Sequence, residues 1–374
     1  METLRKFLSP ILFPISLIYG LIVYIRNRFY DNQIIFKTNE FKIPIIAIGN
    51  ITVGGTGKTP HTEYLIDLLK EQFNVATLSR GYKRKSKGFV LATTNSTTFE
   101  IGDEPRQIKQ KFPETMVAVD RNRADGINKL LTENPNLDVI LLDDAFQHRQ
   151  VKANLSILLI DYSKPISRDY LLPFGNLREQ ASEMRRANII IITKTPITLK
   201  PIDRRIISTE LKAFPYQDVY FSTFNYGNLA PVFNKEQKAI SIKELKDFQV
   251  LLVTGIANPK PLLDYLISQN IEQVKTIDFP DHHQYSQSDI VAIENKFNEL
   301  DTPKKIIITT EKDAMRLQIF INIADNLKEK WFYLPIKVVF QNEQTDRFNK
   351  QIIEYVRKNK THSFLYPKQS KLYT

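Results

Sequence analysis

A glycine-rich segment that ends in Gly57-Lys58-Thr59 is the part of the sequence with the clearest chemistry. The apolar run 43–48 precedes it, and 61–70 follows with helical apolar spacing, which is the order of strand, loop and helix in a phosphate-binding loop. Glycines let successive backbone N–H groups point at phosphate oxygens, and the helix N-terminus adds positive potential. Lys58 is expected to reach the β- and γ-phosphates, and the Thr59 hydroxyl to ligate Mg²⁺. The expected nucleotide-binding residues are Thr52, Val53, Gly54, Gly55, Thr56, Gly57, Lys58 and Thr59.

One position of this loop departs from the standard pattern. That pattern has a glycine six residues before the lysine, where this chain has Thr52. Gly54 and Gly55 are expected to supply the missing flexibility. The alternative interpretation is an ordinary glycine-rich turn between a strand and a helix.

A second apolar run, 139–142, ends in two acids, Asp143 and Asp144. A carboxylate at the end of a strand beside a phosphate-binding loop holds Mg²⁺, directly or through water. His148 and Arg149 follow in the next loop, where doubly wound folds bind ligands. They are candidate substrate contacts, with a polar turn as the alternative.

Two further segments contain groups suited to phosphate or proton transfer. Arg80 follows the run 75–79, and a guanidinium binds phosphate bidentately, although a solvated basic loop is the alternative. Asp103 and Glu104 begin an expected helix, where an acid is a preferred N-cap. They also form a candidate catalytic acid pair, because transfer to a hydroxyl benefits from a carboxylate that accepts the proton. Asp281-His282-His283 offers a histidine beside an acid, which can orient the ring.

Composition limits the class of protein. The chain has 374 residues and no cysteine, which excludes disulfides, thiol catalysis and cysteine-ligated metals. Its formal net charge of +11 favours an anionic partner: nucleic acid, an acidic membrane surface or a phosphorylated substrate. The basic C-terminal segment, 357–371, is expected to be a solvated tail.

The N-terminal segment 7–25 is apolar and is flanked by basic residues on both sides. Its length approaches that of a bilayer span, but Pro10 and Pro14 interrupt it. A helix lying in the membrane interface, a single span and a buried core helix are the three interpretations.

Apolar runs alternate with helical stretches through the first two hundred positions, which predicts a doubly wound, mostly parallel α/β domain. The expected strands are 43–48, 75–79, 116–119, 139–142, 156–160 and 188–192, and the expected helices 60–71, 104–111 and 123–132. A polar, aromatic stretch, 214–233, is the candidate linker. Strands at 250–253, 274–279, 305–309 and 331–339 with helices at 259–269 and 286–300 predict a second, smaller α/β domain. The expected divisions are an N-terminal membrane-associated helix at 1–30, a P-loop domain at 31–213, the linker at 214–233 and the second domain with its basic tail at 234–374.

Taken in order, these segments resemble the tetraacyldisaccharide 4'-kinase family, also called lipid A 4'-kinases. The matching segments are the apolar N-terminus, Gly49-Asn50, the loop 52–59, Ser79-Arg80-Gly81-Tyr82, Gly102-Asp103-Glu104-Pro105, the segment 143–149, Leu172-Pro173, Leu177-Arg178-Glu179, the segment 253–259, Asp281-His282-His283 and Thr310-Glu311-Lys312-Asp313. The resemblance implies an enzyme on the cytoplasmic face of the bacterial inner membrane. Such enzymes move the γ-phosphoryl group of ATP, with Mg²⁺, to the 4'-hydroxyl of a tetraacylated glucosamine disaccharide 1-phosphate, giving lipid IVA in lipid A biosynthesis.

The resemblance also implies roles for single residues. Asp103 is the catalytic base, supported from the second domain by His282, which Asp281 orients. Lys58 acts on the phosphates, and Asp143 is the Mg²⁺ carboxylate with Glu104 or Asp144 nearby. The residues that contact the phosphorylated sugar or the transferring phosphate are Arg80, Arg121, His148, Arg178 and Glu179. The chain departs from the family pattern at Ala145, Phe174, Asn176 and Gln180, which affects the expected loop shapes.

The resemblance implies a lipid substrate and a membrane surface as partners, without nucleic acid or an obligate protein partner. Two other classes compete with it. A membrane-associated P-loop ATPase or GTPase that switches a partner would need no acceptor base. A nucleic-acid-binding ATPase is suggested by charge alone, and the sequence contains no recognised nucleic-acid module.

Overall fold

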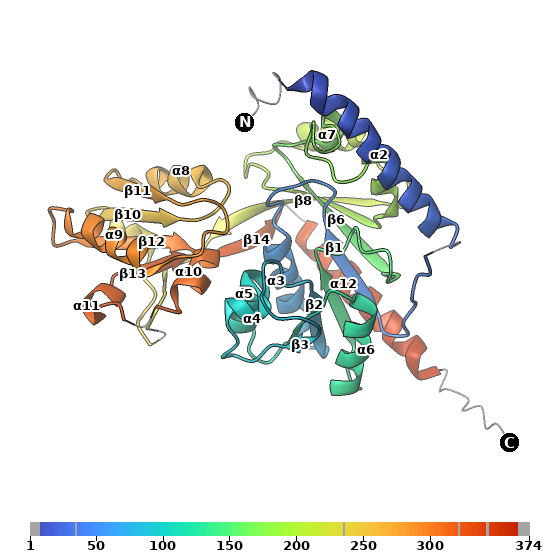
Figure 1. Ribbon diagram of the computed structural model, residues 1–374, viewed down its shortest axis with the longest axis horizontal. Coiled ribbons are helices and arrows are strands. Elements are labelled where there is room, and N and C mark those ends of the chain that lie inside the picture. The colour runs from blue at the N-terminus through green and yellow to red at the C-terminus, as the bar shows by residue number, and fades with distance from the viewer. Residues whose placement is uncertain (1–7, 34–35, 235, 321, 342–343, 366–374) are drawn as a thin grey trace.

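A computed structural model describes residues 8–33, 36–234, 236–320, 322–341 and 344–365, and Figure 1 shows two α/β domains joined by strands. The larger domain is built on a nine-stranded sheet and the smaller on a five-stranded sheet. A long helix, α2 (Ser9–Asp31), lies along the outer side of the larger domain.

The nine-stranded sheet is parallel except at its two edges, as the continuous apolar runs predict for strands covered on both faces. Its edge strands β14 and β3 run antiparallel to their neighbours. In sheet order the strands are β14 (Ile336–Phe340), β8 (Asp218–Tyr226), β7 (Ile189–Thr193), β6 (Leu155–Asp161), β1 (Ile45–Gly49), β5 (Val139–Asp143), β2 (Val75–Ser79), β4 (Met116–Val119) and β3 (Val90–Leu91).

Alternate residues of the central strand β1 pack into different cores. Ile46 and Ile48 join the apolar faces of three helices, α3 (Lys58–Leu69), α5 (Asp103–Lys111) and α12 (Gln344–Leu365). Ile45 and Ala47 face the opposite side, where α6 (Arg123–Glu133) packs. The remaining helices of this domain are α4 (Thr98–Ile101) and α7 (Pro201–Leu211), with short 3₁₀ turns at Ile166–Arg168 and Ala181–Arg186. Helices on both faces confirm the expected doubly wound class.

The smaller domain has its own core around a second parallel sheet. Its strands, in sheet order, are β11 (Val274–Asp278), β10 (Gln249–Thr254), β12 (Lys305–Thr310), β13 (Trp331–Leu334) and the antiparallel β9 (Ala230–Pro231). Its helices are α8 (Lys260–Ser268), α9 (Gln287–Asn298), α10 (Glu311–Leu317) and α11 (Asp325–Lys328), with a 3₁₀ turn at Ile242–Leu245.

The connection between the domains differs from the expected one. The segment expected as a linker forms β8 and β9, each of which belongs to a sheet. The expected strand 331–339 is interrupted at Pro335, so that β13 lies in the small sheet and β14 pairs with β8 in the large one. Helix α12 then packs on the larger domain through Phe348, Ile352 and Val356. The C-terminal part of 234–374 is therefore part of the first domain's core, and the basic residues 357–360 lie on a helix.

Helix α2 presents its apolar side outward, because its polar side is the side that docks. Ser16 and Asn27 are buried, and the Ser16 hydroxyl donates to the Leu171 carbonyl at 2.8 Å. Only 17% of the most apolar 18-residue stretch of this helix is buried, which argues against a core helix. Within the described residues, α2 is the one helix long and apolar enough to cross a membrane. The exposed apolar residues are Ile11, Phe13, Ile15, Leu17, Ile18, Leu21, Ile22, Tyr24 and Ile25.

Candidate active site

The phosphate-binding loop connects β1 to α3, as the glycine pattern predicts. Gly54 and Gly57 have φ of +105° and +90°, a region that favours glycine. A Cβ at Gly57 would lie 2.5 Å from Phe224 Cζ, so a side chain there would also collide. The loop is braced from the neighbouring strands, because Asn50 Nδ2 donates to Thr56 Oγ1 and Thr193 Oγ1 donates to the Thr56 carbonyl.

The structure explains why Thr52 replaces the usual glycine. Thr52 forms an antiparallel bridge with Leu177, and the N–H of Val53 donates to the Asn176 carbonyl at 2.8 Å. Extended backbone in a β-bridge suits a β-branched residue and has no need of glycine. The loop 171–179 therefore holds both the start of the phosphate loop and, through Ser16 and Leu171, helix α2.

The two acids of the apolar run lie beside the loop, because β5 pairs directly with β1 at Ile48 and Asp143. Asp143 is 1% exposed and accepts from Thr62 Oγ1 at 3.3 Å. Burial, together with Glu104 and Asp144, raises the pKa of Asp143 to about 7. Asp144 lies 3.5 Å from Lys58 Nζ. Burial opposes ionisation of Asp144, but Lys58 and Arg178 outweigh it and lower the pKa of that carboxyl.

These carboxylates fit a Mg²⁺ ion that takes most of its ligands from elsewhere. Burial and neighbouring negative charge disfavour the ionised form of Asp143, and a bound cation would stabilise that form. In the described part of the chain, no three His, Asp or Glu side chains are grouped closely enough to form a metal cage. Mg²⁺ is usually held by one or two carboxylates plus waters and phosphate oxygens, so Asp143 with the Thr59 hydroxyl is a suitable donor set.

Asp103 and His282 meet across the interface between the two domains. His282 Nδ1 lies 3.2 Å from Asp103 Oδ2, although 179 positions separate them. Arg316 of α10 also donates to Asp103 Oδ2. Burial opposes ionisation of Asp103, but the hydrogen bonds from His282 and Arg316 prevail and lower its pKa to about 2. The sequence did not single out Arg316, because an arginine within a helix gives no local signal of a partner in another domain.

The structure does not support the expected role of Asp281 in orienting His282. Asp281 is exposed, and the His282 ring nitrogens instead contact Asp103 and Lys312 within the described residues. The Tyr82 ring packs edge-on against the imidazole, with 5.2 Å between centroids. Glu104, the next residue after Asp103, lies 3.6 Å from Lys312 and adds to the negative field at Asp143.

The expected substrate residues fall into two groups. Arg80, His148 and Arg178 surround the acids: Arg178 Nη1 lies 3.5 Å from Asp144 Oδ1, and Arg80 acts electrostatically on His148. Burial, Arg123 and Arg80 lower the pKa of His148 to about 4, so the ring is neutral at pH 7.

Glu179 and Arg121 lie apart from that group. Glu179 is completely buried, and its two oxygens accept from Arg26 and Arg186, which ties α2 to the domain. Arg121 is exposed.

Arg123 is a second site residue that sequence reasoning missed. It is 1% exposed, and Nη1 donates to the Asp120 carbonyl, whereas Nε and Nη2 have no hydrogen-bond partner among the described residues. Burial lowers its pKa to about 10 against the attraction of Asp143 and Asp144. A buried guanidinium with unused N–H groups beside a phosphate loop is a candidate anion ligand. The only hint in the sequence was the pair of arginines Arg121 and Arg123, of which Arg123 is the buried one.

Comparisons with known proteins all indicate one family. Residues 8–356 match the family described as Tetraacyldisaccharide-1-P 4'-kinase. A tetraacyldisaccharide 4'-kinase from Phocaeicola vulgatus is 49% identical over 94% of this chain and 96% of its own length. One from Flavobacterium johnsoniae is 46% identical over 96% of this chain and 99% of its own length. A crystal structure of LpxK from Aquifex aeolicus in complex with ATP has a TM-score of 0.72 and 30% identity, over 94% of this chain and 99% of that one.

Proposed function

This chain belongs to the tetraacyldisaccharide-1-P 4'-kinase family, and we propose how its active site performs the kinase reaction. The enzyme transfers the γ-phosphoryl group of ATP to the 4'-hydroxyl of a tetraacylated glucosamine disaccharide 1-phosphate, a step of lipid A biosynthesis. The observation that carries the mechanism is a phosphate loop beside Asp143, with a separate carboxylate, Asp103, held at the domain interface. A nucleotide switch protein has no use for that second carboxylate.

The nucleotide side of the site is built from the loop and β5. Backbone N–H groups of 54–59 cradle the phosphates, and Lys58 neutralises charge that shifts toward the bridging oxygen. Thr59 and Asp143, with Asp144 and Glu104 nearby, would hold Mg²⁺, which would supply charge neutralisation and orientation of the phosphates. Arg123 is a second proposed phosphate contact, because its free N–H groups are buried beside the acids.

The acceptor side is served by Asp103 as general base. Phosphoryl transfer proceeds through a loose transition state, so the main task of the base is to orient the hydroxyl and take its proton late. His282 holds the carboxylate from the second domain. Arg80, His148 and Arg178 are the proposed contacts to the phosphorylated sugar, since a 1-phosphate calls for guanidinium donors.

The lipid substrate explains the outward apolar side of α2. We place that side in the membrane, with Arg26 and Arg28 near the headgroups, and assign the enzyme to the cytoplasmic face of the inner membrane. The same helix docks on the loop 171–179, which contains Arg178. That arrangement supports delivery of a membrane-held sugar to the basic group around Asp144.

The test is phosphoryl transfer from labelled ATP to tetraacyldisaccharide 1-phosphate in detergent micelles. Wild-type protein is expected to label the lipid only with Mg²⁺ present. Asp103→Asn should lower transfer about 10²- to 10⁴-fold while ATP still binds. Asp264→Asn, the same change at an exposed residue of α8, serves as the matched control. Mg²⁺-independent labelling, or full transfer by Asp103→Asn, would contradict the mechanism.

A further inference from the structure

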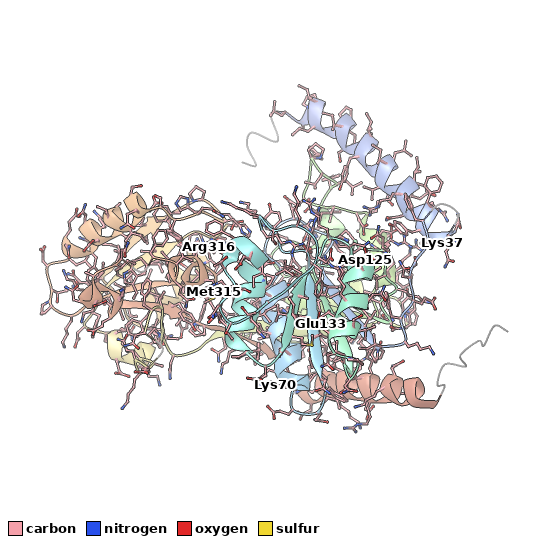
Figure 2. The ribbon with its side chains drawn as sticks, turned by 60° about the horizontal axis from the view of Figure 1, so that its bottom comes forward. Lys37, Lys70, Asp125, Glu133, Met315 and Arg316 are labelled. Carbon is pink, nitrogen blue, oxygen red and sulfur yellow. The ribbon has the colours of Figure 1, made fainter. Side chains whose placement is uncertain are left out.

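Arg316 joins the second domain to the base candidate of the first. It extends from α10 and is 5% exposed, and Figure 2 shows it where the two domains meet. Its Nε and Nη2 donate to Asp103 Oδ2 at 2.9 and 2.5 Å. Its Nη1 donates to Asp313 Oδ1 at 2.9 Å and to the Gly255 carbonyl at 3.2 Å. All three nitrogens are used, so the guanidinium is held in one orientation.

The two oxygens of Asp103 have different surroundings. Arg316 and His282 both contact Oδ2. Oδ1 accepts no hydrogen bond from the side chains or backbone groups that the structure describes, although the Asp103 side chain is only 15% exposed. One oxygen is thus occupied by the second domain, and the other is left to accept a proton.

A second cation on α10, Lys312, determines which ring nitrogen of His282 carries the hydrogen. Lys312 Nζ lies 3.1 Å from His282 Nε2, and an ammonium can only donate, so Nε2 accepts. Nδ1 then carries the hydrogen and donates to Asp103 Oδ2. The 3.3 Å approach of Arg316 Nη2 to Nδ1 is a contact between two donors that share Oδ2, and not a hydrogen bond between them.

We propose that Arg316 is a positioning residue for phosphoryl transfer, which holds the Asp103 carboxylate with Oδ1 facing the acceptor hydroxyl. The proposal rests on the proposed role of Asp103 as the base. Because Arg316 comes from the second domain, the base is fully arranged only when α10 lies against α5. The groups that face Asp103 are His282 and Arg316 with Lys312, and Asp313 and Tyr285 face Arg316 from its own domain.

The hydrogen bonds to Oδ2 make Asp103 a weaker base but fix its orientation. The strong donors to Oδ2 lower the pKa of Asp103 to about 2, with burial opposing them. A weak base is tolerated in a loose phosphoryl-transfer transition state, where positioning and electrostatics supply most of the rate. The same hydrogen bonds keep the carboxylate ionised throughout the working pH range.

The experiment compares kcat and the KM for ATP in wild type, Arg316→Met, Arg316→Lys and Arg106→Met. Arg106 is the matched control, because it donates across the same α5 and α10 interface to Gln318 and does not contact Asp103. Arg316→Met is expected to lower kcat about 10²-fold with little change in the KM for ATP. Arg106→Met should leave both constants near their wild-type values, because it leaves the contacts of Asp103 intact.

Arg316→Lys should recover part of kcat, since it restores the charge without the two-pronged contact. If Arg316→Met misfolds, Arg316→Lys carries the test: a fall in kcat of about tenfold with an unchanged KM for ATP is expected. Wild-type kcat in Arg316→Lys, or an equal fall in kcat in Arg106→Met, would overturn the proposal. Full transfer by Asp103→Asn would instead overturn the proposed base, so the two failures are distinguishable.

Discussion

Replacing Arg123 by methionine should make the unliganded protein more stable and the enzyme much slower. The side chain is 1% exposed and leaves Nε and Nη2 without partners in the described structure. Methionine fills a similar volume and adds no polar group, so the substitution removes a cost that the folded protein carries only for function.

Two estimates of that cost agree. A buried unsatisfied donor costs about 1–3 kcal/mol, and two nitrogens are affected. Burial lowers the Arg123 pKa from 12.5 to about 10, which corresponds to roughly 3 kcal/mol of disfavoured charge. The shift already includes the attraction to Asp143 and Asp144, so the variant is expected to gain about 1–3 kcal/mol without ligand after the lost hydrogen bond to the Asp120 carbonyl is subtracted.

The assay is a thermal melt with and without Mg²⁺–ATP, followed by kcat/KM with the lipid substrate. Without ligand, Arg123→Met should melt above the wild type; with Mg²⁺–ATP, its gain in melting temperature should be smaller, because stabilisation follows affinity. The kcat/KM should fall about 10²- to 10³-fold if the guanidinium stabilises the transferring phosphate.

The same change at Arg121 separates two assignments. Arg121 is exposed and is the arginine that the family resemblance indicated. The structure predicts that Arg121→Met costs less than Arg123→Met. A variant Arg123→Met that melts lower than wild type, or that keeps kcat/KM within threefold, would refute the reasoning from burial.

Three other expectations concern the metal, the domain interface and the membrane. Asp143→Asn should raise the Mg²⁺ concentration needed for half-maximal activity at least tenfold, measured by Mg²⁺ titration; an unchanged requirement would exclude Asp143 as a ligand. Lys111 bridges Glu63 and Glu311 across the interface, so Lys111→Met should destabilise the protein by about 3 kcal/mol at pH 8.5 in urea unfolding. Burial and Glu311 raise the Glu63 pKa to about 7, so Glu63 takes up a proton below that pH and the loss should shrink at pH 5.5; a pH-independent loss would contradict this. Ile18→Asp with Ile22→Asp, on the outward side of α2, should abolish flotation with anionic vesicles but leave the melting temperature unchanged; retained flotation would argue against that side as the anchor.

Local pattern was sufficient for the buried strands at the centre of the large sheet and for the nucleotide loop. Strands β2 and β4 coincide with the expected runs, and β1 and β5 differ by a residue or two, because a fully buried parallel strand is written as a continuous apolar stretch. The Gly-Lys-Thr ending gave the phosphate loop, since the loop, the preceding strand and the following helix are adjacent in the chain.

Local pattern failed where a position depends on the order of strands. Nothing near Pro335 shows that β14 returns to the large sheet and pairs with β8, and the second domain was therefore expected to run to the C-terminus. Thr52 departs from the standard loop pattern, and its bridge to Leu177, a partner outside the loop, explains the departure. Both facts come from partners far away in sequence.

The sequence by itself determined the reaction class, through residue types that must lie close together in the chain to bind phosphate. Only the tertiary structure decided which side chains complete the site. Arg316 reaches Asp103 across 213 positions, and Arg123, not its exposed neighbour, is buried beside the acids. The reason is physical: burial and cross-domain hydrogen bonds set the charge and orientation of these groups, and both depend on how the two sheets are assembled.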